Sequence, residues 1–90
     1  MIALMSRVVT IRNRKSSMRL TDVEWRILEQ ICLQEKTKRK NLLEMIEDNC
    51  SRGFSYTSSV RLFMLIYLYN KQYKQKNGVS CLQKTLTTLQ

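Results

Sequence analysis

The chain contains no histidine and no proline, and its two glycines are Gly53 and Gly78. Without histidine it lacks the most common metal ligand and the most common general acid or base. Its three cysteines, Cys32, Cys50 and Cys81, lie far apart and include no C-x-x-C pair. The sequence therefore predicts no metal site and no cofactor. It also predicts no enzyme, because there is no glycine-rich phosphate loop and no nucleophile with a recognisable base partner.

The few helix-breaking residues indicate helices joined by short connections. With 43% apolar and 26% charged residues, the chain has the composition of a globular protein. Cys32 and Cys50 are interpreted as small apolar residues on helix faces in a reducing compartment. The apolar run Met1–Met5 is too short for a signal-peptide core. We therefore expect a cytoplasmic protein, and its 90 residues favour association with a second subunit.

The charge is large and segregated. The formal net charge is +9, and all seven acidic residues lie between Asp22 and Asp48. Five basic residues precede Asp22, and these are Arg7, Arg12, Arg14, Lys15 and Arg19. A second basic cluster spans Lys36–Lys40. Two local basic clusters favour a polyanionic partner such as nucleic acid. The alternative is a solubilising surface without a specific partner.

Residues 15–20 have the pattern of a strand with two different faces. Side chains alternate in a strand, which places Lys15, Ser17 and Arg19 on one face and Ser16, Met18 and Leu20 on the other. Such a strand needs a backbone partner and a cover for its apolar side chains. A second copy supplies both by two-fold symmetry, and the resulting two-stranded ribbon fits the major groove of DNA.

Residues 1–14 are predicted to be a separate arm or a short strand. Arg7–Arg12 is rich in residues that favour strands, and a turn at Asn13–Arg14 would fold it back beside residues 15–20. The alternative is a basic arm that orders on a nucleic acid backbone. In both cases we expect Arg12 and Arg14 to contact DNA phosphates.

Two helices are expected after the strand. Thr21 and Glu24 form a capping-box pattern at the start of a helix over residues 22–34, in which Trp25 is the largest candidate core residue. Thr37 is the predicted N-cap of a second helix over residues 38–50. The basic residues of its first turn oppose the helix dipole, which favours a phosphate there. The alternative is that they are ordinary exposed side chains.

A third helix is expected over residues 58–74, after a C-cap at Gly53. Its centre, residues 62–69, is apolar on all sides but is too short to span a membrane. Burial on all sides in so short a chain requires a partner subunit. The predicted domains are therefore the arm 1–14, the core 15–74 and a mobile tail 75–90.

Lys15–Thr21 leading directly into Asp22–Trp25 resembles the start of the ribbon-helix-helix transcription regulators. Val9–Arg12 before the strand and Ser58–Arg61 in the third helix make the chain similar to an extended subgroup of that family. The resemblance covers about residues 8–69. It implies a mainly α fold with a short β-ribbon, an intertwined homodimer and an extra C-terminal helix.

The resemblance also implies the site residues. Base contacts are expected from Lys15, Ser17 and Arg19, and contacts to the DNA backbone from Thr37, Lys38 and Arg39. The residues expected in the dimer core are Met18, Leu20, Trp25, Leu42, Ile46, Phe63 and Tyr67. The expected partners are double-stranded DNA and a second copy, with higher-order assembly on DNA left open.

The expected function is sequence-specific transcriptional regulation by repression. One alternative is the antitoxin of a toxin–antitoxin pair with the same fold, but such antitoxins usually have a long disordered tail. Another is a basic module that docks on an acidic protein or a membrane surface.

Overall fold

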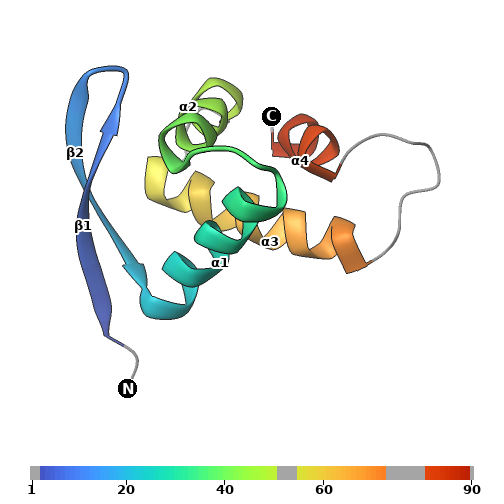
Figure 1. Cartoon of the computed structure of the whole chain (residues 1–90), viewed down its shortest axis with the longest axis horizontal. Helices are drawn as coiled ribbons and strands as arrows, with labels where there is room; N and C mark the ends of the chain where they lie inside the picture. Colours follow the sequence, from blue (N-terminus) through green and yellow to red (C-terminus); the bar gives the residue numbers. More distant parts are fainter. Residues whose placement is uncertain (1–2, 51–54, 73–80, 90) are drawn as a thin grey trace. The chain divides into compact units, whose positions relative to one another are not determined.

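The computed structural model describes residues 3–50, 55–72 and 81–89 (Figure 1). Its elements in chain order are β1 (Leu4–Ile11), β2 (Arg14–Thr21), α1 (Asp22–Gln34), α2 (Arg39–Asn49), α3 (Tyr56–Gln72) and α4 (Cys81–Leu89). The chain divides into two compact units, Met1–Glu44 and Met45–Gln90, with the boundary inside α2. The prediction of a mainly helical fold with a two-stranded antiparallel ribbon is confirmed.

The ribbon is a hairpin within one chain. β1 and β2 pair antiparallel, from Leu4 opposite Thr21 to Ile11 opposite Arg14. The two-residue turn consists of Arg12 and Asn13, both with positive φ, 50° and 66°. Positive φ at both positions is typical of a type I′ turn, whose twist matches that of the strands it joins. The turn therefore lies one residue earlier than predicted, and residues 4–11 form a strand.

The hairpin has one buried and one exposed face. The buried side chains are Val9 and Ile11 of β1 and Met18 and Leu20 of β2. Residues opposite one another share a face in an antiparallel pair, and the predicted alternation of β2 is therefore confirmed. Ser16, which shares the face of Met18 and Leu20, is exposed.

The predicted partner of β2 was a second copy of the same strand, whereas its partner here is β1. Among the described residues the sheet has two strands, so the second edge of β2 has no strand beside it.

Helix α1 begins and ends where the sequence predicted. The Glu24 amide donates to Thr21 Oγ1 at 3.2 Å, and the Thr21 amide donates to Glu24 Oε1 at 2.8 Å, which completes the capping box. Trp25, Leu28 and Ile31 form the buried face, at the spacing of an amphipathic helix. Trp25 Nε1 donates to the Met5 carbonyl at 2.9 Å, and this bond ties β1 to α1.

Helix α2 starts at Arg39 rather than Lys38. The Leu42 amide donates to the Lys38 carbonyl at 3.0 Å, which places Lys38 at the N-cap. The prediction of Thr37 as N-cap is therefore wrong. The Thr37 amide donates to the Cys32 carbonyl at 3.0 Å. Thr37 therefore lies at the end of the turn that follows α1, in which Lys36 has a φ of 52°. The predicted C-cap at Gly53 lies outside the described residues.

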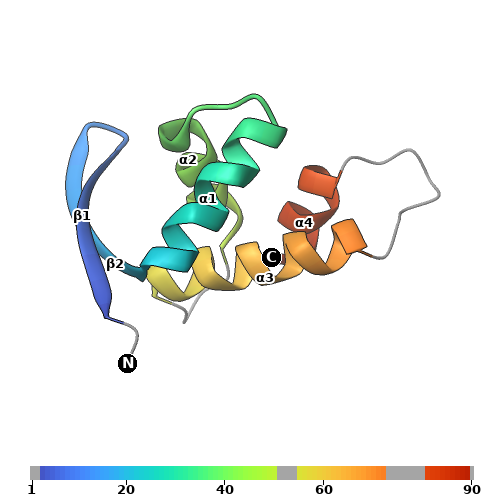
Figure 2. The same cartoon turned by 60° about the horizontal axis from the view of Figure 1, so that its bottom comes forward.

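The second unit contains α3 and α4, which lie side by side (Figure 2). Helix α3 starts at Tyr56, two residues before the predicted first residue, Ser58. At this start the Ser58 amide donates to Ser55 Oγ at 3.1 Å. Its buried apolar side chains are Val60, Phe63, Met64 and Tyr67. Leu65, Leu68 and Tyr69 are exposed in the single chain, so their burial by a partner subunit stays a prediction. Within the described ranges no helix has the length and apolarity needed to cross a membrane.

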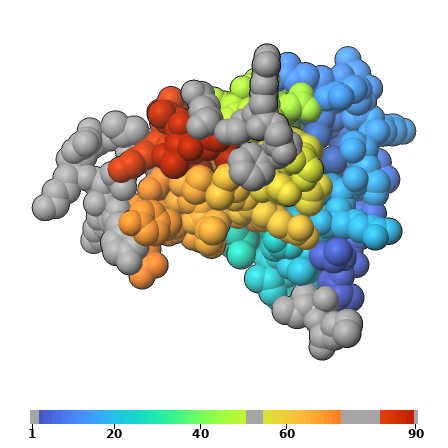
Figure 3. All heavy atoms as spheres, turned by 180° about the vertical axis from the view of Figure 1, so that it is seen from behind, coloured from blue at the N-terminus to red at the C-terminus, as the bar shows by residue number. Residues whose placement is uncertain are grey.

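Helix α4 lies in the segment predicted as a mobile tail. It packs along the C-terminal half of α3 (Figure 3). Thr85, Leu86 and Leu89 are buried, and the Asn70 side-chain amide donates to Thr85 Oγ1 at 3.2 Å. A mobile tail was expected over residues 75–90, and residues 81–89 of this segment form a helix packed on α3.

Candidate nucleic acid interface

The outer face of the hairpin carries the three predicted base-contacting residues. Lys15, Ser17 and Arg19 are all exposed on the face opposite Met18 and Leu20. Because they alternate along one strand, their side chains project in the same direction at a spacing of two residues. The structure thus places together the three side chains that the sequence selected.

Strand β1 adds residues to this face that the sequence analysis did not select. Ser6 lies opposite Arg19, Val8 opposite Ser17 and Thr10 opposite Lys15. Ser6 Oγ and Ser17 Oγ are 2.6 Å apart and share a hydrogen bond, so the Ser17 hydroxyl has a partner within the chain. Finding these residues from sequence requires the register of the hairpin, which depends on a turn one residue from the predicted position.

Arg12 is the first residue of the hairpin turn and Arg14 is the first residue of β2, and both are exposed. The Arg12 backbone amide donates to Glu44 Oε2 at 3.1 Å, which anchors the turn to α2. Arg14 lies opposite Ile11 and so belongs to the inner side of the sheet by register. The predicted phosphate contacts in this region thus project from the tip of the hairpin rather than from its outer face.

The start of α2 holds the second group of predicted phosphate contacts. Thr37 is half-buried, whereas Lys38 and Arg39 are exposed. A cavity of about 260 Å³ lies between β1 and this end of α2, and it is lined by Val8, Val9, Thr10, Arg39, Lys40 and Leu43. The structure therefore brings Arg39 next to the hairpin.

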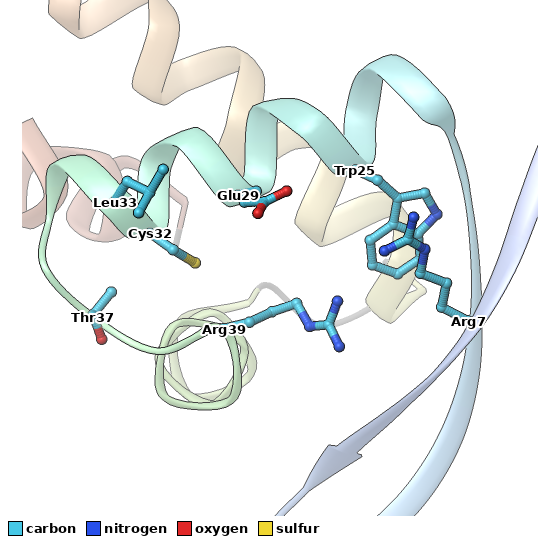
Figure 4. Close-up of a pocket in the computed structure, with 7 residues that line it drawn as sticks. All are labelled: Arg7, Trp25, Glu29, Cys32, Leu33, Thr37 and Arg39. Atoms are coloured by element: carbon cyan, nitrogen blue, oxygen red, sulfur yellow. The ribbon is translucent and has the colours of Figure 1, made fainter.

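A larger cavity of about 350 Å³ lies beside Trp25 (Figure 4). It is lined by Arg7, Trp25, Glu29, Cys32, Leu33, Thr37 and Arg39. The guanidinium carbon of Arg7 is 5.1 Å from the centroid of the Trp25 ring, and that of Arg39 is 5.7 Å away. Both distances are those of cation–π contacts. Arg39 was expected to contact phosphate, whereas Arg7 was expected only as a member of the basic cluster before Asp22.

Cys32 lines the same cavity. Burial is the main cause that raises the pKa of its thiol, and the Glu29 carboxylate adds to that effect, whereas the Arg39 guanidinium opposes it. The thiol is therefore protonated at neutral pH and is a poor nucleophile. Across residues 3–50, 55–72 and 81–89, no group of three or more histidine, cysteine or acidic side chains is arranged to hold a metal ion.

Comparison with known proteins gives one family match. A family model described as a ribbon-helix-helix domain matches residues 4–68, well over half of the chain. Comparison with curated proteins and with solved structures gives no match. The matched range begins at the first residue of β1 and ends inside α3.

Proposed function

The chain belongs to the ribbon-helix-helix domain family, and we propose that it is a sequence-specific transcriptional regulator that binds double-stranded DNA. Proteins of this family are generally DNA-binding regulators that form dimers. The observation that carries the proposal is the exposed row of Lys15, Ser17 and Arg19 on the outer face of the hairpin.

The chemistry of this row suits base recognition in the major groove, which admits a two-stranded ribbon. Arg19 donates two parallel hydrogen bonds to guanine, and a good pair of this kind contributes about 1–3 kcal/mol of discrimination. Lys15 donates to guanine or to phosphate. The Ser17 hydroxyl shares a hydrogen bond with Ser6. A hydroxyl can both donate and accept, so Ser17 can form a further hydrogen bond with a base.

Contacts to the DNA backbone position the ribbon. Lys38 and Arg39 at the start of α2, with Thr37 beside them, supply charge and hydrogen-bond donors to phosphate groups. Arg12 and Arg14 extend this basic surface at the tip of the hairpin. A net charge of +9 supports attraction to DNA at long range.

The proposed active species is a homodimer that represses transcription by covering a promoter. No strand of the described residues lies along the second edge of β2, and we propose that β2 of another copy pairs with it there. The seven residues predicted for the dimer core, Met18, Leu20, Trp25, Leu42, Ile46, Phe63 and Tyr67, are all buried in the single chain. Their contribution to a dimer interface stays a prediction.

Selection of bound duplexes from a random pool, at near-physiological salt, tests the proposal. An enriched repeat with two-fold or direct symmetry supports a regulator that reads sequence. Binding that depends on salt without any enriched motif contradicts sequence recognition.

The variant Arg19→Ala tests base contact on the selected duplex. We expect affinity for that duplex to fall roughly tenfold or more, with little change on random DNA. Arg26→Ala is the matched control, because Arg26 is exposed on α1 and pairs with Asp22 at 3.0 Å. Equal losses on both duplexes would show that Arg19 contacts phosphate.

Lys38→Ala tests the backbone contact. We expect similar weakening on all sequences and a decrease of about one in the salt slope of binding. Lys84→Ala, on α4, provides the control for loss of one positive charge. An unchanged slope in Lys38→Ala would remove Lys38 from the phosphate contacts.

A further inference from the structure

Two arginines from different elements meet at one tryptophan ring. Arg7 comes from β1 and Arg39 from the start of α2, and both guanidinium groups lie against Trp25 of α1 (Figure 4). Neither arginine forms an ion pair with another described residue. Both guanidinium groups line the same cavity, so an anion placed between them is attracted by two positive charges.

The geometry leaves suitable donors for that anion. A guanidinium has five N–H donors, and a cation–π contact with a ring does not pair these donors with a hydrogen-bond acceptor. Because both guanidinium carbons lie within 5.7 Å of the ring centroid, they are at most about 11 Å apart. Trp25 Nε1 already donates to the Met5 carbonyl. The tryptophan therefore offers its ring to the two guanidinium groups but no hydrogen-bond donor to the anion.

The cavity has the size and the lining of a binding site. Its volume of about 350 Å³ lies within the usual range for small ligands. The Thr37 side chain also lines it and offers a hydroxyl. Glu29 is the one acidic side chain in the lining, and it opposes an anion at that side.

We propose that this cavity, formed by Arg7, Trp25, Thr37 and Arg39, binds a phosphate group. A phosphate has enough oxygens to accept paired hydrogen bonds from two guanidinium groups, whereas a carboxylate accepts one such pair. Arg7 lies on the inner face of the hairpin by register, so this site is distinct from the base-reading face. The phosphate comes either from a DNA backbone, which rests on the proposed function, or from a free phosphorylated molecule.

Trp25 is the single tryptophan of the chain, so its fluorescence reports directly on the cavity. The intact protein is titrated with inorganic phosphate, with chloride adjusted to hold the ionic strength constant. We expect a saturable change in Trp25 fluorescence. Arg7→Gln and Arg39→Gln should each weaken phosphate binding roughly tenfold, since hydrogen bonds to a charged group are lost.

Three further variants test the role of charge and of the guanidinium shape in phosphate binding. Glu29→Gln should tighten phosphate binding, because it removes the negative charge from the lining, and Arg26→Gln should leave it unchanged. Arg7→Lys keeps the charge without the planar fork and should fall between the wild type and Arg7→Gln. Thermal melting by circular dichroism shows whether each variant is folded. The proposal is overturned if the wild-type protein shows no response to phosphate, or if folded Arg7→Gln and Arg39→Gln bind phosphate as tightly as the wild type.

A short duplex of random sequence distinguishes the two sources. If DNA supplies the phosphate, the duplex displaces inorganic phosphate, and Arg7→Gln weakens duplex binding and lowers the salt slope by about one. If a free molecule supplies it, phosphate still binds the DNA complex, and Arg7→Gln binds the duplex like the wild type. If the wild-type protein binds no duplex at all, the proposed function fails. The titration with inorganic phosphate still shows whether the cavity binds phosphate.

Discussion

Single residues of the hairpin differ sharply in environment according to the face they occupy. Leu20 has no exposed surface, whereas 64% of Val8 is exposed. The period-two pattern predicted the faces of β2, because alternation is a local property of an extended strand. The cavity residues Arg7 and Trp25 could not be paired from sequence, since their contact depends on the register of β1 and the Trp25–Met5 hydrogen bond.

We expect Leu20→Ala to lower the free energy of unfolding by about 2–5 kcal/mol, because it leaves a void in a fully buried site. Val8→Ala, in the neighbouring strand but on the exposed face, should change it by less than about 0.5 kcal/mol. Urea unfolding of both variants measures the difference. Similar losses in the two variants would mean that a second layer covers the outer face.

The hairpin turn depends on a backbone conformation that most residues avoid. Asn13 adopts a φ of 66°, and asparagine tolerates this left-handed region better than most other residues. The sequence placed the turn at Asn13–Arg14, because the Asn-Gly signal that usually fixes a type I′ turn is missing. The second strand and the following helix were predictable, whereas the first strand was one of two alternatives and the turn was placed one residue too late.

Asn13→Ala should therefore destabilise the protein by about 1 kcal/mol, whereas Asn13→Gly should change stability little. Asn41→Ala is the matched control, because Asn41 is exposed within α2 and alanine favours a helix. Denaturant unfolding of the three variants gives the comparison. A loss in Asn41→Ala equal to that in Asn13→Ala would contradict a role for the backbone conformation.

Helix α4 is a short element that was not predicted from the sequence. Threonine lowers helix propensity in this stretch, and residues 75–90 showed no strong helical period in the sequence. The apolar spacing was nevertheless present, since Leu82, Leu86 and Leu89 lie four and then three residues apart with Thr85 beside them. Packing against α3 stabilises α4 as a helix, and intrinsic helix propensity does not account for such tertiary contacts.

The buried hydrogen bond between Asn70 and Thr85 stabilises this packing. Thr85→Val keeps the shape but leaves the Asn70 amide without that acceptor, and we expect a loss of about 1–3 kcal/mol. Thr88→Val removes an exposed hydroxyl from the same helix and should cost far less. Thermal unfolding of the two variants tests this. No difference between them would mean that Asn70 finds another acceptor.

At the scale of the whole molecule, the net charge of +9 acts in opposite ways on the two proposed associations. Two copies with the same charge repel one another, and salt screens that repulsion. DNA binding releases counterions from the phosphate backbone, so added salt weakens it. The two equilibria can therefore be separated by their salt dependence.

We expect the dissociation constant of the homodimer to fall as salt increases, whereas the dissociation constant for DNA rises over the same range. Analytical ultracentrifugation measures the first quantity, and fluorescence anisotropy with a labelled duplex measures the second. The unfolding temperature should also rise with protein concentration, since association stabilises the folded state by mass action. A dimer that weakens with salt would indicate ion pairs across the interface rather than pairing of β2 edges. A monomeric mass at all concentrations would contradict the dimer itself.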